Sequence, residues 1–444
     1  MVSALILSLT ACTSWSVSPD APAPTATTSA VGTASAAAPP TETASTSGGD
    51  IDPSQWAAAR QSAVADLVRR RLAALEHSDR TGWLAALDGA ADDSLRRTQA
   101  AVFDRMTRMG AGDFVVTDLE ESTPPVPAPR TVPVEWDARA SLTYRLRGFD
   151  TAPRAFDLDL TFKAGPGAPT RLVVSGWAPS GRPQPWDLDG LVVRRSPSAM
   201  VLAVGSPARV DEVAARAATA AARVAAVWGS ARPAVWVAPA TDADAARLLG
   251  RTSADLGEVA AATEGPLTPG QHAGADRIVL VPGAWTSLQP AGRDVVMTHE
   301  LTHVTVRAAT TQAVPLWLSE GFAELVAYAP IDLPEGKIVA PALRHARSAG
   351  LPRMFPADAD FEPGTASLPS AYGLSLLALR TLADAHGTAA VVRLYQAAAG
   401  GLDVRTDRVG DGEAAVDDAL QAVLHTDRAA VVRAWQARIA RLLR

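Results

Sequence analysis

The sequence contains a single cysteine, only two lysines and no uninterrupted apolar run long enough to cross a membrane, which takes about 18 residues. The single cysteine, Cys12, excludes an internal disulfide, a four-cysteine zinc knuckle and an iron–sulfur cluster, so any metal ion must be bound by His, Asp or Glu side chains. The net charge of −6 argues against non-specific nucleic-acid binding, which requires a strongly basic surface. We therefore expect no nucleic-acid partner.

The remaining composition is typical of a globular protein, with 48% hydrophobic and 20% charged residues in a chain of 444. At about 150 residues per domain, this length predicts two or three domains with enough apolar residues to form a core. Changes of composition and periodicity divide the chain into four segments, 1–11, 12–50, 51–195 and 196–444.

The first segment is a short apolar run that ends in Leu9-Thr10-Ala11, directly before Cys12. This tetrapeptide resembles the lipobox of bacterial lipoproteins, in which the signal peptide is removed and the cysteine carries a lipid. Residues 12–50 consist largely of Ala, Pro, Ser, Thr and Gly, a composition that predicts a disordered tether. We expect an extracytoplasmic protein, anchored through Cys12 to the outer face of the cell membrane, or secreted if the resemblance is accidental.

Residues 51–195 predict helices followed by antiparallel strands. Apolar residues recur at helical spacing from Trp56 to Leu75 and again from Trp83 to Met109, and from Val134 to Trp177 the period changes to two. Helices followed by a curved meander of this length resemble the nuclear transport factor 2 superfamily. Trp136, Trp177 and Trp186 could line a cavity there, although core packing is the default interpretation.

Residues 196–444 predict a second α+β region. Short strands at 200–204, 234–238 and 277–281 alternate with helices that end near Trp228 and Leu249, which indicates a small mixed sheet. From Val295 onward the pattern is almost wholly helical, with an interruption between Pro330 and Pro369. The predicted fold is therefore α+β, with N-terminal helices and a curved antiparallel sheet followed by a mixed sheet and a helical C-terminal half.

The clearest candidate for a metal-binding or catalytic motif is His299-Glu300-Leu301-Thr302-His303. Histidines at i and i+4 lie on one face of a helix, about 40° apart around its axis, so both imidazoles can bind one Zn²⁺ ion. Glu300 lies about 100° around the axis from His299, which puts its carboxylate beside the metal, where it can take a proton from a metal-activated water.

A catalytic zinc needs a third protein ligand, which must here be His, Asp or Glu. Trp317-Leu318-Ser319-Glu320-Gly321-Phe322-Ala323-Glu324 predicts a second helix with two carboxylates on one face. Glu320 can be the ligand, and Glu324 can accept the free N–H of a metal-binding histidine. Gly321 suggests a close approach between helices, because glycine in a helix interior costs about 1 kcal/mol.

The two motifs together resemble the gluzincin metallopeptidases, in particular the peptidase MA-like group. The resemblance covers residues 276–387 and implies one zinc ion held by His299, His303 and Glu320, with Glu300 as general base. It also implies an oxyanion donor on a later helix, for which Tyr372 is the candidate, with His345 and His386 as fallback donors. A tyrosine that only packs its ring on the core is the alternative for Tyr372.

These observations predict a zinc metallopeptidase that hydrolyses peptide bonds of a peptide or protein substrate. The aminopeptidases of the same clan carry a Gly-Ala-Met-Glu-Asn-type strand before the zinc helix, and nothing similar occurs between Gly265 and Thr298, which disfavours an aminopeptidase. If the strand at 277–282 lies at the edge of its sheet, it could pair with an extended substrate. The alternative is an inactive lipoprotein that uses the peptidase fold as a binding or assembly module.

Overall fold

The computed structural model describes residues 15–16, 53–89, 93–122, 133–165, 168–362, 364–401 and 412–444. The predicted signal peptide, the predicted lipidation site Cys12 and the predicted tether lie outside these residues, except for positions 15 and 16. Within the described ranges, no helix is both long and apolar enough to span a bilayer.

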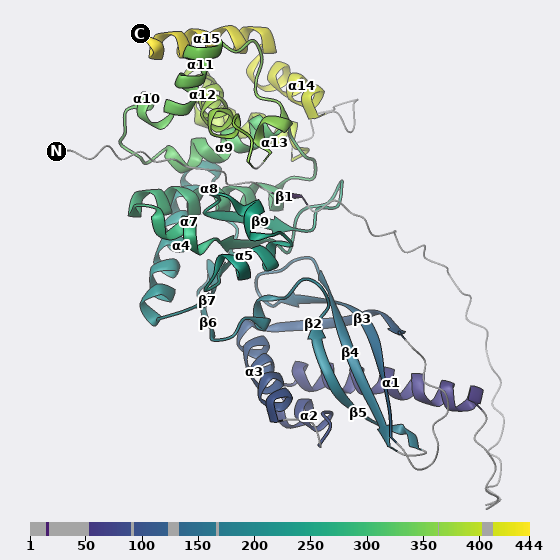
Figure 1. Cartoon of the computed structure of the whole chain (residues 1–444). Coiled ribbons are helices and arrows are strands. Elements are labelled where there is room, and N and C mark those ends of the chain that lie inside the picture. The colour runs from purple at the N-terminus through teal and green to yellow at the C-terminus, as the bar shows by residue number, and fades with distance from the viewer. Residues whose placement is uncertain are drawn as a thin grey trace, which may run out of the picture.

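The N-terminal part consists of three helices packed on one face of a four-stranded antiparallel sheet (Figure 1). The alternation predicted from Val134 onward is confirmed. In strand β3 (Val134–Leu146), every second side chain from Trp136 to Leu146 is buried. Register shifts between the first two strands and between the last two give the sheet its bends. In chain order the elements are α1 (Pro53–Glu76), α2 (Arg80–Ala85), α3 (Asp93–Met109), β2 (Ala111–Glu121), β3 (Val134–Leu146), β4 (Arg154–Gly165) and β5 (Ala168–Pro179).

One strand of this part is not apparent from the sequence pattern, whereas its tryptophans lie as expected. Strand β2 follows α3 after Gly110, whereas the periodicity identified strands only from Val134 onward. Trp136 and Trp186 are buried in the core, and Trp177 packs edge-on against Trp83 with 5.4 Å between ring centroids. These tryptophans therefore contribute to packing, the default interpretation.

The second part is built on a mixed sheet with the strand order β1-β9-β10-β8-β7-β6. Strands β7, β8 and β10 run parallel to one another, β6 is antiparallel to β7, and β9 is antiparallel to β10 but parallel to β1. The strand near Arg277 is not at an edge, because β10 is hydrogen-bonded to β8 on one side and to β9 on the other, so the condition for substrate pairing at this strand is not met. The elements are β1 (Trp15–Ser16), η1 (Pro185–Asp187), β6 (Leu191–Arg195), β7 (Ala199–Val204), α4 (Pro207–Trp228), β8 (Ala234–Ala238), α5 (Asp242–Leu249), α6 (Ser253–Leu256), β9 (Ala261–Gly265) and β10 (Arg277–Leu280).

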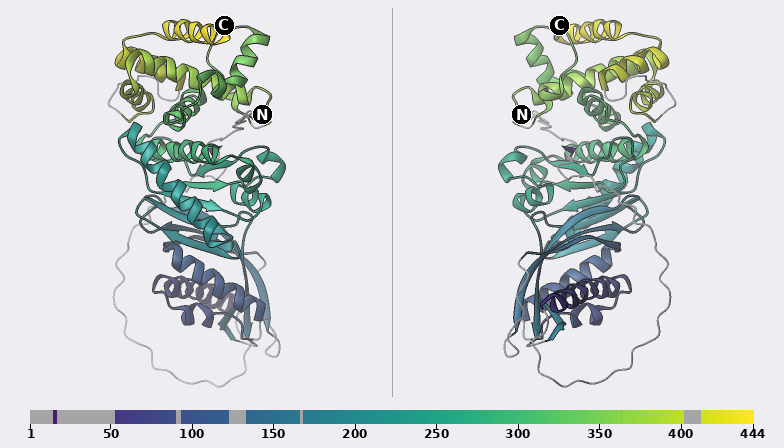
Figure 2. Two further views of the ribbon diagram at one scale, coloured as in Figure 1. Left: turned by 90° about the vertical axis from the view of Figure 1, so that its left-hand side faces the viewer. Right: turned by 90° about the vertical axis from the view of Figure 1, so that its right-hand side faces the viewer.

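Helices make up the rest of the described chain, which confirms the predicted helical C-terminal half and the α+β class. The stretch between Pro330 and Pro369, read as an interruption, itself contains short helices. The elements are α7 (Pro282–Ser287), α8 (Pro290–Ala309), α9 (Leu316–Tyr328), α10 (Glu335–Ile338), α11 (Ala340–Ala349), η2 (Asp358–Phe361), α12 (Leu368–His386), α13 (Thr388–Ala398), α14 (Gly412–Leu424) and α15 (Arg428–Leu443). Figure 2 shows the mixed sheet between the N-terminal part and these helices.

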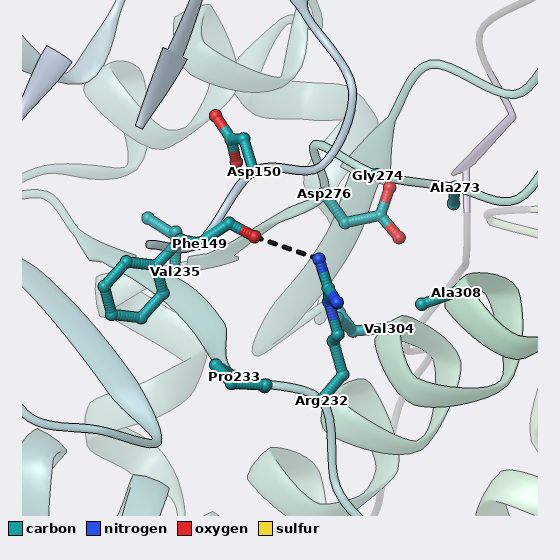
Figure 3. A pocket seen from close by; sticks show the side chains of 10 residues that line it. All are labelled: Phe149, Asp150, Arg232, Pro233, Val235, Ala273, Gly274, Asp276, Val304 and Ala308. Atoms are coloured by element: carbon teal, nitrogen blue, oxygen red, sulfur yellow. Dashed lines mark hydrogen bonds between the residues drawn. The ribbon is translucent and has the colours of Figure 1, made fainter. Parts of the chain in front are cut away.

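The hairpin 147–153 between β3 and β4 joins the N-terminal part to the mixed sheet. Asp150 accepts two hydrogen bonds of 2.7 Å from the buried Arg277 on β10, and the Thr151 N–H donates to the Gly274 carbonyl at 2.8 Å. Arg232 donates to the Phe149 carbonyl at 3.1 Å, and both residues line a small pocket (Figure 3). The two parts are thus connected by buried polar contacts as well as by the chain itself.

Candidate metal centre

Helix α8 presents both histidines of the sequence motif on one buried face. It begins at Pro290, and every residue from Val295 to Val306 is buried. His299 and His303 are 0% and 1% exposed, and Glu320 of the neighbouring helix α9 is 1% exposed. The motif therefore lies between two packed helices.

Three ligand atoms converge between α8 and α9. The Nε2 atoms of His299 and His303 are 3.0 Å apart, and they lie 3.1 and 3.3 Å from Oε2 of Glu320. Ligands at about 2.0–2.1 Å from a tetrahedral zinc ion are about 3.3 Å from one another, so the triangle matches one face of such a site. The two-nitrogen, one-oxygen donor set also suits zinc. The residues present therefore fit the ion.

The electrostatics of the triangle favour a cation. Glu324 lies one turn beyond Glu320 on α9, and its Oε1 is 3.0 Å from Nδ1 of His299. A proton on that nitrogen leaves a lone pair on Nε2 of neutral His299, which then faces the Glu320 carboxylate and the His303 nitrogen. Three electron-rich atoms at this spacing repel one another unless a positive charge lies between them. Glu324 thus has the tautomer-fixing position that the sequence predicts.

The pKa values of His299 and Glu320 reflect the same attraction between opposite charges. Burial alone lowers the pKa of His299, but the hydrogen bonds and charges of Glu320 and Glu324 outweigh it and raise that pKa to about 10. Burial alone raises the pKa of Glu320, but His303 and His299 outweigh it and lower that pKa to about 2. The centre therefore holds a buried anion that stabilises positive charge on its neighbours.

Glu300, the predicted general base, directly follows His299 on α8. Its side chain is fully buried, and its Oε2 accepts a hydrogen bond of 2.6 Å from the hydroxyl of Thr263 on strand β9. Among the described residues, Oε1 has no hydrogen-bond partner. A buried carboxylate oxygen without a partner is costly, so this oxygen calls for a polar group that the described residues do not supply. Thr263 was missed by the sequence analysis, because the small and polar residues of β9 give no strand signal.

Helices α9 and α12 approach closely at Gly321, as the sequence suggests. A Cβ atom at this position would lie 2.7 Å from Cδ2 of Leu379 and 2.8 Å from the Ser375 carbonyl oxygen. The absence of a side chain therefore lets α12 pack directly behind the helix that carries Glu320.

The first prediction concerns this contact. We expect Gly321→Ala to lower the free energy of unfolding by about 1–3 kcal/mol, because the added methyl group overpacks the contact with α12. Gly336→Ala in α10 is the control, since its Cβ would meet Cδ1 of Leu343 at an ordinary 3.7 Å. Urea denaturation of both variants measures the difference. Equal stabilities for the two variants would contradict the packing explanation.

Tyr372 lies beside the centre, near the start of α12. Its ring is buried, with its centroid 6.0 Å from that of His299 and 5.5 Å from that of Phe361. The fallback donors are exposed: His345 on α11, and His386 at the far end of α12, about 21 Å along the helix from Tyr372 at 1.5 Å per residue. Of the three candidates, the structure brings only Tyr372 to the centre.

Two small pockets lie where the N-terminal part meets the mixed sheet, and neither is lined by His299, Glu300, His303 or Glu320. The centre is recognised instead by its converging ligand atoms. Comparisons of the chain with protein-family models, with curated proteins and with solved structures return no match.

Proposed function

We propose that the protein is a zinc-dependent peptidase of the gluzincin type, with an N-terminal part that resembles the nuclear transport factor 2 superfamily. The observation that carries the proposal is the buried triangle of His299, His303 and Glu320 next to a carboxylate, Glu300, with one unpartnered oxygen. Ligands alone would suit a structural metal site, whereas an adjacent general base is what hydrolysis needs.

A zinc ion bound by the triangle would supply Lewis-acid activation of a water molecule and polarise the scissile carbonyl. Oε1 of Glu300 accepts the proton of the attacking water and later donates it to the leaving nitrogen, while Thr263 holds the other carboxylate oxygen. The Tyr372 phenol donates a hydrogen bond to the oxygen on which negative charge develops. Glu324 keeps His299 in the tautomer that binds the metal.

Strand β9 is the element best placed to align a substrate. It carries Thr263, and among the described residues its outer edge pairs only with β1, at Glu264 and Gly265. An extended peptide that added to this edge would run past Glu300. The carboxylate of Glu264 is already neutralised by Arg154 and Arg182, so it does not supply a free acceptor for a substrate amino terminus. These contacts favour cleavage within a chain over removal of the first residue.

The location follows from the predicted lipobox. We propose that Cys12 anchors the protein to the outer face of the bacterial cell membrane and that the peptidase acts on extracytoplasmic peptides or proteins. The catalytic assignment does not depend on the anchor.

The direct test is digestion of a peptide library by a soluble form that begins at Gly49, with products identified by mass spectrometry. We expect internal cleavages that stop when a chelator removes the metal and resume when zinc is returned. Stoichiometric zinc without cleavage of any peptide would favour the alternative function, a binding or assembly module.

A second prediction tests the oxyanion donor. We expect Tyr372→Phe to lower kcat by about 10²- to 10³-fold with little change in KM, because the hydroxyl contributes mainly in the transition state. Tyr144→Phe is a matched control, since Tyr144 is also buried but donates its hydroxyl to Gln184 in the N-terminal part. If kcat is unchanged in Tyr372→Phe, the hydroxyl of Tyr372 is not the oxyanion donor and the residue only packs its ring on the core.

A further inference from the structure

Strand β9 contacts the metal centre on one face and the N-terminal part on the other. Successive side chains of a strand point to opposite faces of its sheet. Thr263 points to α8 and donates to Glu300, whereas the next residue, Glu264, points to the N-terminal part. Both residues are buried, with exposures of 0% and 3%.

The contacts of Glu264 come from the N-terminal part. Arg154, the first residue of β4, donates to Oε1, and Arg182, in the loop after β5, lies 2.8 Å from Oε2. Burial alone raises the pKa of Glu264, but the charges of Arg154 and Arg182 outweigh it and lower that pKa. Glu264 is therefore a buried carboxylate whose charge is compensated from the other part of the molecule.

A second connection lies directly across the sheet. Glu264 pairs in register with Arg277 of β10, and Arg277 binds Asp150 of the hairpin 147–153 seen in Figure 3. Two adjacent strands are thus fixed to the N-terminal part at the same register position. Beyond this pair, β9 has only the short β1 on its outer side among the described elements.

We infer that the N-terminal part is a component of the active site, because it holds β9 where Thr263 can orient the general base Glu300. Thr263 is then a positioning residue, and Arg154 acts on catalysis through Glu264 and Thr263 without contact with substrate. This inference rests on the proposed peptidase function. Its physical basis is that a general base must lie within hydrogen-bond reach of the proton it takes, and a misplacement of about 1 Å can cost about 100-fold in rate.

The first test separates the hydroxyl of Thr263 from its volume. Thr263→Val should lower kcat by about 10- to 100-fold with zinc content and KM unchanged, as for other partners that orient groups around a metal. Thr263→Ser, which keeps the hydroxyl, should retain most of the activity. Thr310→Val is the control, because Thr310 is another buried threonine whose hydroxyl bonds only to the Val306 carbonyl among the contacts described.

The second test addresses the connection to the N-terminal part. Arg154→Met should increase amide hydrogen exchange in peptides that cover residues 261–265, with zinc still bound, and should lower kcat. Its effect on kcat should not add to that of Thr263→Val, because both variants misplace the same carboxylate. Arg139→Met is the control, since the ion pair of Arg139 with Asp159 on β4 is exposed to solvent.

The two readouts distinguish the inference from the proposed function. Wild-type protein that binds zinc but cleaves no peptide overturns the proposed function, and the exchange data alone then decide whether Arg154 holds β9. Unchanged exchange in Arg154→Met, or fully additive losses of kcat in the double variant, would overturn the inference even in an active peptidase.

Discussion

Glu300→Gln is expected to abolish most hydrolysis without loss of zinc. The substitution keeps the size of the side chain and an oxygen that can accept the hydrogen bond of Thr263, but the amide cannot take a proton from water. Removal of a general base costs about 10²- to 10⁴-fold in rate, and the loss should fall on kcat. Zinc should stay bound, because Glu300 is not one of the three residues whose ligand atoms converge. Cleavage rates with a peptide identified from the library provide the measurement.

The matched control is Glu258→Gln, which removes the same charge from an exposed residue shortly before β9. Its activity and zinc content should equal those of the wild type. A Glu300→Gln variant that retained wild-type activity would contradict the assignment of the base. A variant that lost its zinc would instead indicate that Glu300 is itself a ligand.

Asp150→Ala is expected to have the largest effect on stability. The side chains of Asp150 and Arg277 are each 2% exposed, and their two hydrogen bonds are both 2.7 Å. Removal of one partner leaves an uncompensated buried guanidinium, which costs about 3–5 kcal/mol. Urea denaturation followed by circular dichroism measures this loss.

Asp159→Ala provides the comparison for that experiment. Its partner is Arg139, and the two side chains are 57% and 63% exposed, so the pair should contribute less than about 1 kcal/mol. The replacement of both buried partners, Asp150→Leu with Arg277→Met, should recover much of the loss, since no buried charge is left unpaired. A loss below about 1 kcal/mol for Asp150→Ala would show that the hairpin contributes little to the contact between the two parts.

The candidate metal ligands could be predicted from the sequence because their positions follow from helix geometry. The i, i+4 spacing of His299 and His303 lies within one helix, and helix geometry alone places both side chains on one face. Glu320 and Glu324 share the same spacing on the next helix. Gly321 indicates a close approach of another helix to α9, which the structure identifies as α12. These predictions needed no knowledge of the tertiary fold beyond the packing of two helices.

The rest of the site depends on contacts between distant residues. Thr263 reaches Glu300 only because β9 lies beside α8, and the strand Ala261–Gly265 has no large apolar side chain to reveal it. The sequence pattern instead indicates the strand Arg277–Leu280, which could pair with a substrate only at an edge, but this strand lies inside the sheet and its apolar character reflects that burial. The pairing of Glu264 with Arg154 joins residues 110 positions apart, which no short motif can encode.

Zinc content is the measurement that tests the central claim most directly. Elemental mass spectrometry of the soluble form beginning at Gly49 should give about one zinc per chain, and His303→Ala, which removes one of three ligands, should lose it. Such a result would establish the centre on which Glu300, Tyr372 and Thr263 act. No zinc in the wild type, even after reconstitution with the metal, would contradict the account and leave α8 and α9 as a packing interface.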